Sequence, residues 1–232
     1  MVTDARTVMI TRTHMRMTMR IDPILTLTQW LSPSYPVGAF TYSHGLESSV
    51  HSGMVHDAPS FSEWLKDVLS HGAGRNDVIL LAAAYNTNSE ESLHGLDELA
   101  RALAPSAERL LETDQQGAAF AQTTGAVFDT DLSRLTYPVA IGRAAALQQL
   151  PLRDTARLFL HAFAASLTSA AIRLIPLGQT AGQTALHSVT PLCQSIADQA
   201  ITQSLDDLGA SSFATDIASM AHETQYSRLF RS

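Results

Sequence analysis

The chain has 232 residues, of which 45% are hydrophobic and 16% are charged, and its formal net charge at pH 7 is -7. This length can bury a substantial core, and no linker divides the sequence. A negative chain without a visible cluster of cations is a poor match for nucleic acid or an anionic membrane as the main partner. The charged fraction lies below the roughly 25% typical of soluble domains, which favours a protein whose surface is partly covered by partners.

Lysine and cysteine usage exclude further classes of protein. Lys66 is the only lysine and follows Leu65, so the chain has no Gly-x-x-x-x-Gly-Lys-Ser/Thr phosphate loop. A single cysteine, Cys193, excludes an intrachain disulfide and a multi-cysteine metal site, and it fits a reducing, cytoplasmic location. No uninterrupted apolar run reaches the roughly 18 residues that span a bilayer.

Residues 1–21 differ from the rest of the chain. They are rich in Thr, Met and Arg, with Asp4 as the one acidic residue among the first twenty. They lack the apolar core of a secretion signal. We expect a disordered N-terminal extension without a functional role.

A shaped turn is predicted within residues 32–47. Pro33 and Pro36 fix φ and remove backbone donors, so the apolar run before them cannot continue as helix. Gly38 permits a positive φ or a close backbone approach. The residues expected to begin a new helix after the turn are Phe40, Tyr42, His44 and Glu47.

The clearest predicted helix covers residues 60–72. Ser60 and Glu63 have the spacing of a capping box, and Gly72 can end the helix. One apolar face is formed at i, i+3, i+4, i+7 and i+8 by Phe61, Trp64, Leu65, Val68 and Leu69.

Two further helices are expected in the middle of the chain, and alternating β patterns are missing. The first ends before Pro105 and the second reaches towards Val127. Their apolar positions are Leu93, Leu96, Ala100 and Leu103 in the first, and Leu110, Ala118 and Ala121 in the second.

Two long helices are predicted in the C-terminal half, over residues 152–175 and 179–205, and both are expected at the centre of the bundle. Pro191 should bend the second one near His187. Small residues on the first should let another helix approach closely, along the stripe Leu158, Ala162, Ala165, Ser169 and Ile172. The expected fold is therefore all-α: a single-domain helical bundle of about eight to ten helices over residues 22–220, with an extended C-terminal tail over residues 221–232.

The tail combines aromatic, apolar and cationic side chains at a chain end, where residues are usually frayed and polar. If it orders on a partner, Tyr226, Leu229 and Phe230 would be buried while Arg228 and Arg231 pair with carboxylates. The alternative is that the tail docks onto its own helical body.

The segment from Tyr35 to Glu47 reads Tyr-Pro-Val-Gly-Ala-Phe-Thr-Tyr-Ser-His-Gly-Leu-Glu. It resembles the N-terminal signature of UreF family urease accessory proteins, Leu-Pro-Val-Gly-Ala-Phe-Ser-Tyr-Ser-x-Gly-Leu-Glu, with Tyr35 in place of Leu and His44 in place of the frequent Gln. Three further stretches follow the order of that family: residues 137–142, residues 176–179 and the ending 226–232. The resemblance covers the chain from residue 22 onward.

This resemblance implies a non-enzymatic adaptor without a cofactor of its own. A UreF-like protein would form a homodimer, join the accessory protein UreD/UreH to the GTPase UreG, and regulate GTP-dependent nickel delivery into apo-urease. The expected partner-binding residues are Pro36, Gly38, Phe40, Tyr42 and Glu47 in the turn, and Tyr226, Arg228, Leu229, Phe230 and Arg231 in the tail.

Four alternatives stay open. His44, Glu47 and His51 would share a face at i, i+3 and i+7 of one helix and could contact nickel transiently, although such spacings are common by chance. A direct nickel metallochaperone would use His44, His51, His56 or Cys193. An arginine of the tail could act as an arginine finger, or the chain could be a helical enzyme of unknown activity.

Overall fold

The computed structural model describes residues 21–132 and 135–232, and within these ranges the chain forms ten α-helices, two short 3-10 helices and no strand. The all-α prediction is confirmed. The expected disorder of residues 1–21 concerns a segment that, except for Ile21, lies outside the described ranges. The α-helices are α1 (Pro23–Trp30), α2 (Leu46–His51), α3 (Ala58–His71), α4 (Ala73–Asn86), α5 (Glu90–Ala102), α6 (Ala107–Phe128), α7 (Tyr137–Leu147), α8 (Leu152–Leu174), α9 (Gly178–Ala200) and α10 (Phe213–His222), and the 3-10 helices are η1 (Ala39–Thr41) and η2 (Leu205–Asp207).

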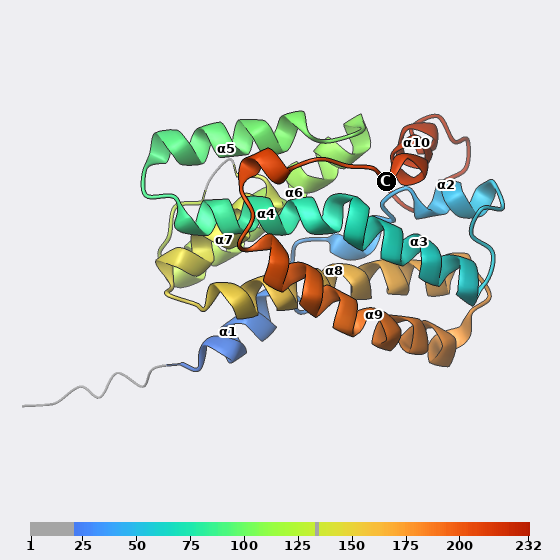
Figure 1. Cartoon of the computed structure of the whole chain (residues 1–232), viewed down its shortest axis with the longest axis horizontal. Coiled ribbons are helices and arrows are strands. Elements are labelled where there is room, and N and C mark those ends of the chain that lie inside the picture. Colours follow the sequence, from blue (N-terminus) through green and yellow to red (C-terminus); the bar gives the residue numbers. More distant parts are fainter. Residues whose placement is uncertain (1–20, 133–134) are drawn as a thin grey trace, which may run out of the picture.

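Helices α4 and α8 form the centre of the bundle. Helix α4 packs against α3, α5, α7, α8 and α9, while α8 packs against α9 and also contacts α1, α2, α3 and α7. Figure 1 shows α3 and α4 crossing the molecule above α8 and α9, with α10 and α2 together at one end. The expected central place of α8 is confirmed, whereas α4 is not among the helices predicted from the sequence.

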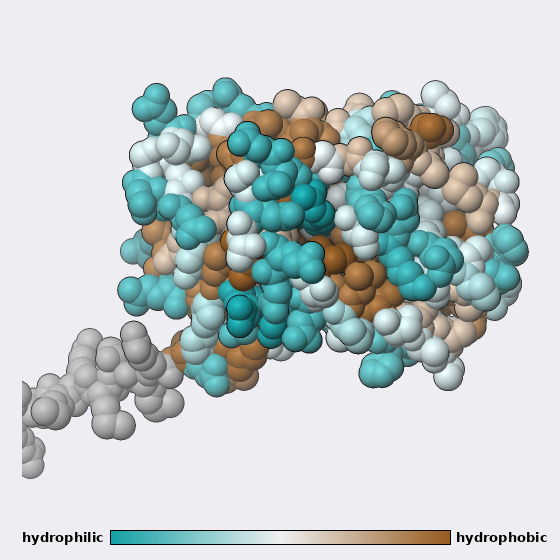
Figure 2. Space-filling model, in the orientation of Figure 1, coloured by the Kyte–Doolittle hydropathy of each residue, from teal (hydrophilic) through white to brown (hydrophobic). Residues whose placement is uncertain are grey.

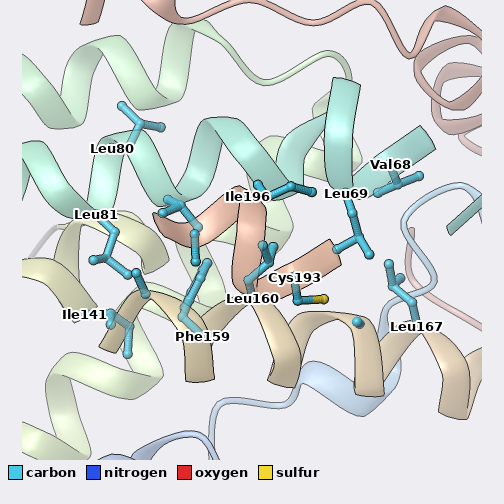
Figure 3. Packing of buried hydrophobic residues seen from close by; sticks show 14 of the residues in the cluster. Val68, Leu69, Leu80, Leu81, Ile141, Phe159, Leu160, Leu167, Cys193 and Ile196 are labelled. Carbon is cyan, nitrogen blue, oxygen red and sulfur yellow. The ribbon is translucent and has the colours of Figure 1, made fainter. Parts of the chain in front are cut away.

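The core joins α3, α4, α7, α8 and α9 in one apolar cluster. Leu81 of α4, Ile141 of α7 and Leu160 of α8 are each at most 1% exposed, and Figure 3 shows them with Leu69 of α3 and Cys193 of α9. Burying one such side chain contributes about 1.5–3 kcal/mol. These contacts hold the framework that carries α2, α6 and α10.

Helix α3 has the predicted buried face and the predicted end at Gly72, but its capping box differs from the prediction. Asp57 is the N-cap, and its carboxylate accepts a hydrogen bond from the Ser60 backbone nitrogen at 2.9 Å. Ser60 is thus the N3 residue of the box, and Glu63 instead pairs with Lys66 on the surface. Pro59 in the first turn suits this earlier start, because the helix needs no donor there.

Helix α6 buries a different face from the one predicted. Leu110 is 36% exposed, Ala118 is exposed and Ala121 is half-buried. The face that turns inward is polar in its first half and carries Arg109, Glu112, Gln116, Phe120 and Thr124. The apolar pattern failed because the neighbours of this first half are polar groups of the tail and of α10.

The small-residue stripe on α8 was also assigned wrongly. Leu158, Ala162, Ala165 and Ser169 line a half-open cavity and do not face a closely packed helix. Close approach of α9 occurs only at the last residue of the stripe, Ile172, and the small residue there is Gly182 of α9, where an added Cβ would lie 2.5 Å from Cδ1 of Ile172. Pro191 lies inside α9 as predicted, but the helix ends at Ala200 and not at residue 205.

By length and composition alone, α8 could cross a membrane. Half of its most apolar 18-residue window is buried inside the protein. Because it packs against six other α-helices, we interpret α8 as the core helix of the bundle.

Two glycines provide a test of the α4–α7 packing. In Gly142→Ala, the new Cβ would lie 2.2 Å from the Leu81 carbonyl oxygen, so α7 must move away from α4. We expect the free energy of unfolding to fall by about 2 kcal/mol or more in urea denaturation. The control is Gly95→Ala on α5, where an added Cβ meets nothing within 4 Å, and it should stabilise the protein by about 0.5–1 kcal/mol. Equal effects of the two substitutions would contradict this packing.

Candidate functional site: the docked C-terminal tail

The predicted turn exists and alternates between buried and exposed residues. Gly38 has φ 75° and Gly45 has φ 78°, both in the left-handed region. Tyr35 is buried and hydrogen-bonds Thr124 at 2.7 Å, whereas Pro36 is exposed and Phe40 is 64% exposed. An added Cβ on Gly45 would lie 2.9 Å from the Ser219 backbone nitrogen, so α10 packs directly on the end of the turn.

His44 does not belong to the helix that carries Glu47, so the predicted shared face is wrong. His44 has φ 60°, and α2 begins two residues later, after Gly45. Its ring is 4% exposed and packs edge-on against Phe163, with 5.0 Å between centroids. Burial, aided by the charge of Arg109, holds the pKa of His44 well below its usual range. His51 is exposed at the end of α2.

The other metal candidates are also dispersed. Within residues 21–132 and 135–232, no group of three His, Cys, Asp or Glu side chains could hold a metal ion. His56 is exposed beside Asp57, whereas burial raises the pKa of the Cys193 thiol to about 11. A thiol with such a pKa is a poor source of the thiolate that binds metal.

Glu47 holds the tail by its backbone. Oε1 accepts a hydrogen bond from the Leu229 nitrogen at 2.7 Å, and Oε2 accepts one from the Phe230 nitrogen at 2.8 Å. The carboxylate is buried, with 8% of the residue exposed. Hydrogen bonds to a charged acceptor contribute about 1.5–3 kcal/mol each, so this pair is a strong anchor.

His222, the last residue of α10, extends this anchor to α6. Its Nε2 lies 3.2 Å from Oε2 of Glu47, and its Nδ1 lies 2.7 Å from Oε2 of Glu108. The other oxygen of Glu108 accepts a hydrogen bond at 2.6 Å from Arg228 in the tail. Four charged or titratable side chains from α2, α6, α10 and the tail thus form one continuous network.

The end of the tail is held by a second set of contacts. Ser232 is fully buried, and its carbonyl oxygen accepts hydrogen bonds from the Ser43 nitrogen at 2.9 Å and from the Ser43 hydroxyl. The Ser232 hydroxyl donates to Glu112 at 2.8 Å. Glu112 also pairs with buried Arg109 and accepts a hydrogen bond from Gln116. The inward polar face of α6 therefore receives the last residue.

Side chains on both sides of the tail connect it to the turn. Oε1 of Gln115 accepts hydrogen bonds from the Tyr42 hydroxyl at 2.6 Å and from Arg231 at 3.2 Å. Burial raises the pKa of Tyr42, so its hydroxyl is a proton donor here. Phe230 is 4% exposed beneath the guanidinium of Arg173, which lies 4.1 Å from the ring centroid.

The structure brings together five of the ten predicted partner-binding residues and leaves others facing outward. Tyr42, Glu47, Arg228, Phe230 and Arg231 all contribute to the docked tail, which is the intramolecular arrangement that the sequence left open. Outward-facing residues are Pro36 and Phe40 in the turn and Tyr226 and Leu229 in the tail, while Gly38 is half-buried.

An apolar surface lies beside the outward-facing part of the tail. Phe213, Ile217 and Met220 follow one another at i, i+4 and i+7 on α10 and are 67%, 65% and 51% exposed. Figure 2 shows hydrophobic surface over this end of the molecule, where Figure 1 places α10. The tail adds two more outward-facing side chains, since Tyr226 is fully exposed and Leu229 is 64% exposed.

Sequence reasoning missed the residues that receive the tail. They are Ser43, Glu108, Arg109, Glu112, Gln115, Arg173 and His222. The helical spacing of Arg109, Glu112 and Gln116 could have indicated their role. It places them on the same face of the helix as the apolar Phe120, and this predicts that the buried face extends into polar residues.

A half-open cavity of about 450 Å³ lies next to the tail-binding face of α6. Its walls are mostly apolar, and the charged residues on it are Asp77, Arg109 and Glu112. Burial raises the pKa of the Asp77 carboxyl to about 7, with the nearby Arg109 opposing the rise. Hydroxyl side chains and His161 also line this cavity.

The sequence matches one family of known proteins. The UreF family model matches residues 55–190. The chain belongs to the UreF family. It is 52% identical over 216 residues to the urease accessory protein UreF of Roseobacter denitrificans. The matched region covers 93% of this chain and 97% of that relative. The UreF protein of Ruegeria pomeroyi is 53% identical over 90% of this chain and 96% of its own length, and that of Rhodopseudomonas palustris is 46% identical over 89% and 92%.

Membership of the UreF family implies a role in urease maturation and association with other urease accessory proteins and urease. The family is one of accessory proteins and is not named for a catalytic activity. The family model begins at residue 55, so the turn and the tail lie outside the matched range, although the relatives cover most of the chain.

Removal of the Glu47 carboxylate should destabilise the protein strongly. In Glu47→Ala, two tail N–H groups and His222 lose a buried acceptor, and we expect the free energy of unfolding to fall by about 3 kcal/mol in urea denaturation. The control is Glu63→Ala on α3, whose carboxylate is 76% exposed and whose loss should cost less than about 0.5 kcal/mol. A loss for Glu47→Ala no larger than that of the control would contradict the anchor.

Asp77 should make stability depend on pH in the opposite sense to a paired carboxylate. Its folded-state pKa of about 7 is raised above the ordinary value of 3.8, so the folded protein binds the proton more tightly, and stability is lost as pH rises through this range. We expect Asp77→Asn to increase the free energy of unfolding at pH 8 by roughly 2–4 kcal/mol, and the gain should shrink towards pH 4. A gain that is constant with pH in urea denaturation would refute the assigned cause.

Proposed function

We propose that this UreF family protein is a non-enzymatic, cytoplasmic adaptor that joins UreD/UreH to the GTPase UreG. In this role it regulates GTP-dependent delivery of nickel into apo-urease. The observation that carries the proposal is the way the tail is held: Glu47 binds its backbone, and Tyr226 and Leu229 are left exposed for a partner.

The exposed tail residues and α10 are suited to a protein partner. Tyr226, Leu229, Phe213, Ile217 and Met220 provide aromatic and apolar side chains at one end of the molecule. Exposed aromatic and apolar side chains of this kind are typical of a protein interface. We assign this surface to UreD/UreH.

The turn provides a route by which binding of one partner could affect another. Phe40 is 64% exposed, and its carbonyl oxygen accepts a hydrogen bond at 2.5 Å from Arg173, which also stacks on Phe230. A partner that reorders the tail would therefore change the turn. UreG would be regulated if this surface binds one of its nucleotide states more tightly than the other.

A homodimer would present two such ends to the partners. The role needs no metal site of its own, because nickel is the cargo of the assembly. Direct metallochaperone action through His44, His51, His56 or Cys193 is not favoured, since His44 and Cys193 are buried and His51 and His56 are exposed elsewhere.

Size-exclusion co-elution tests the adaptor. The wild-type chain should co-elute with UreD/UreH, and that complex should then capture UreG in the presence of GTP and Ni²⁺. Tyr226→Ser and Leu229→Ser should each weaken binding of UreD/UreH about tenfold or more, because each removes an exposed apolar contact and leaves the Glu47 hydrogen bonds in place.

Val127→Ser is the matched control, since Val127 is 61% exposed at the far end of α6 from the tail contacts. It should bind like the wild type. The tail assignment fails if the tail variants also bind like the wild type. The adaptor itself fails if the folded wild-type chain captures neither partner.

A further inference from the structure

The half-open cavity of about 450 Å³ has a size typical of a site for a small molecule. Aromatic side chains are concentrated on its walls, since seven of the 27 lining residues are aromatic, against 6% of the whole chain. They come from α1, the turn, α7 and α8, and include Trp30, Tyr35, Tyr42, Tyr137, Phe159 and Phe163. Aromatic rings pack against apolar groups and attract cations over their faces.

Small residues of α8 leave room for this cavity. Ala162, Ala165 and Ser169 line it, and none of the three is fully buried. Larger side chains at these positions would extend into the cavity and fill it. The small-residue stripe that does not receive a packed helix therefore keeps the cavity open.

Asp77 of α4 is the charged group on the cavity wall that has no partner of its own. The other two charged residues there, Arg109 and Glu112, pair with each other. Both act on Asp77 only through their charge, and no residue within 21–132 or 135–232 donates a hydrogen bond to its carboxyl. With His161 counted as neutral, ionised Asp77 gives the wall two carboxylates and one guanidinium.

An ionised carboxylate without a counter-charge is unfavourable at this place. The raised pKa of Asp77 reflects this cost, because burial disfavours the charged form. Ionisable groups in such surroundings occur preferentially at functional sites, where they reduce stability. A bound monocation would supply the missing charge.

A metal ion is a poor match for this wall. Along the described parts of the chain, no three His, Cys, Asp or Glu side chains are placed so that they could hold one. Aromatic rings cannot replace the oxygen and nitrogen ligands that a metal ion requires. An organic cation, in contrast, needs one carboxylate for its charged group and can place its apolar body against the rings.

We propose that the cavity is a binding site for a small organic monocation with an aromatic or apolar body, of the aryl-alkyl ammonium class. The ammonium group binds the Asp77 carboxylate, and the body packs on the aromatic walls beside Ala162.

The cavity shares walls with the site that receives the tail. Tyr42 and Glu112 line it, and they also hydrogen-bond Gln115 and Ser232, respectively. An occupant would thus lie against two groups that position the tail, which gives a small molecule a route to the tail.

Calorimetric titration of the full-length chain at pH 8 with 2-phenylethylammonium and with 2-phenylethanol tests the site. The two probes have the same aromatic body and differ in charge, and Asp77 is mostly ionised at this pH. We expect the ammonium probe to bind about tenfold or more tightly than the alcohol, because only the ammonium forms a charge-assisted hydrogen bond with Asp77.

Three substitutions separate the charge from the space. Asp77→Asn should remove the preference for the ammonium probe. Its control is Asp206→Asn, the same change at an exposed carboxylate of η2, which should retain the preference. Ala162→Phe should abolish binding of both probes, because the new ring occupies the cavity.

The proposal is overturned if the wild-type chain binds neither probe at millimolar concentration, if it does not prefer the ammonium, or if Asp77→Asn keeps the preference. Unchanged binding to Ala162→Phe would place the probes elsewhere and would also overturn it. Displacement of the ammonium probe by an equal concentration of Ni²⁺ would assign the carboxylate to a metal instead. If Ala162→Phe fails to fold, the comparison of Asp77→Asn with Asp206→Asn still decides. No accessory protein is present, so the outcome is independent of the adaptor function proposed above.

Discussion

A buried carboxylate needs partners, and Glu47 finds them 175 to 183 positions further along the chain. The cost of burying this charge is met by two backbone N–H groups and the His222 ring. Because these donors come from the tail and the end of α10, satisfying Glu47 brings both against α2. The position of the tail, the exposure of Tyr226 and the burial of Phe230 all depend on this interaction.

The helical core makes the binding of the tail by Glu47 possible, because it fixes α2, α6 and α10 around this carboxylate. Helix α8 contacts α2 directly, while α4 holds α7, which in turn packs on α6. Gly45 lets α10 pack closely on the start of α2, since a Cβ added to Gly45 would lie only 2.9 Å from the Ser219 backbone nitrogen. The polar face of α6 would be unfavourable in an apolar interior, but it is satisfied here by Ser232, Arg228 and His222.

The groups that hold the tail in place are different from the side chains that the tail exposes to solvent. Backbone recognition by Glu47 does not use the side chains of Leu229 or Tyr226, so these remain available for a partner. Arg173 joins Phe230 to Phe40, so the tail and the turn form one connected surface. An adaptor that must respond to several partners requires such a connection, since coupling between sites depends on shared contacts.

The sequence by itself determined the all-α class, the buried face and end of α3, and the UreF family, and it permitted a positive φ at Gly38. These features depend on local periodicity, on backbone sterics or on motifs that can be read along the chain. Only the tertiary structure decided that His44 leaves the helix, that α6 turns Arg109 and Glu112 inward, and that Glu47 binds the tail. These outcomes depend on groups more than a hundred residues apart, and a charged residue in a sequence does not reveal which distant partner will compensate its burial.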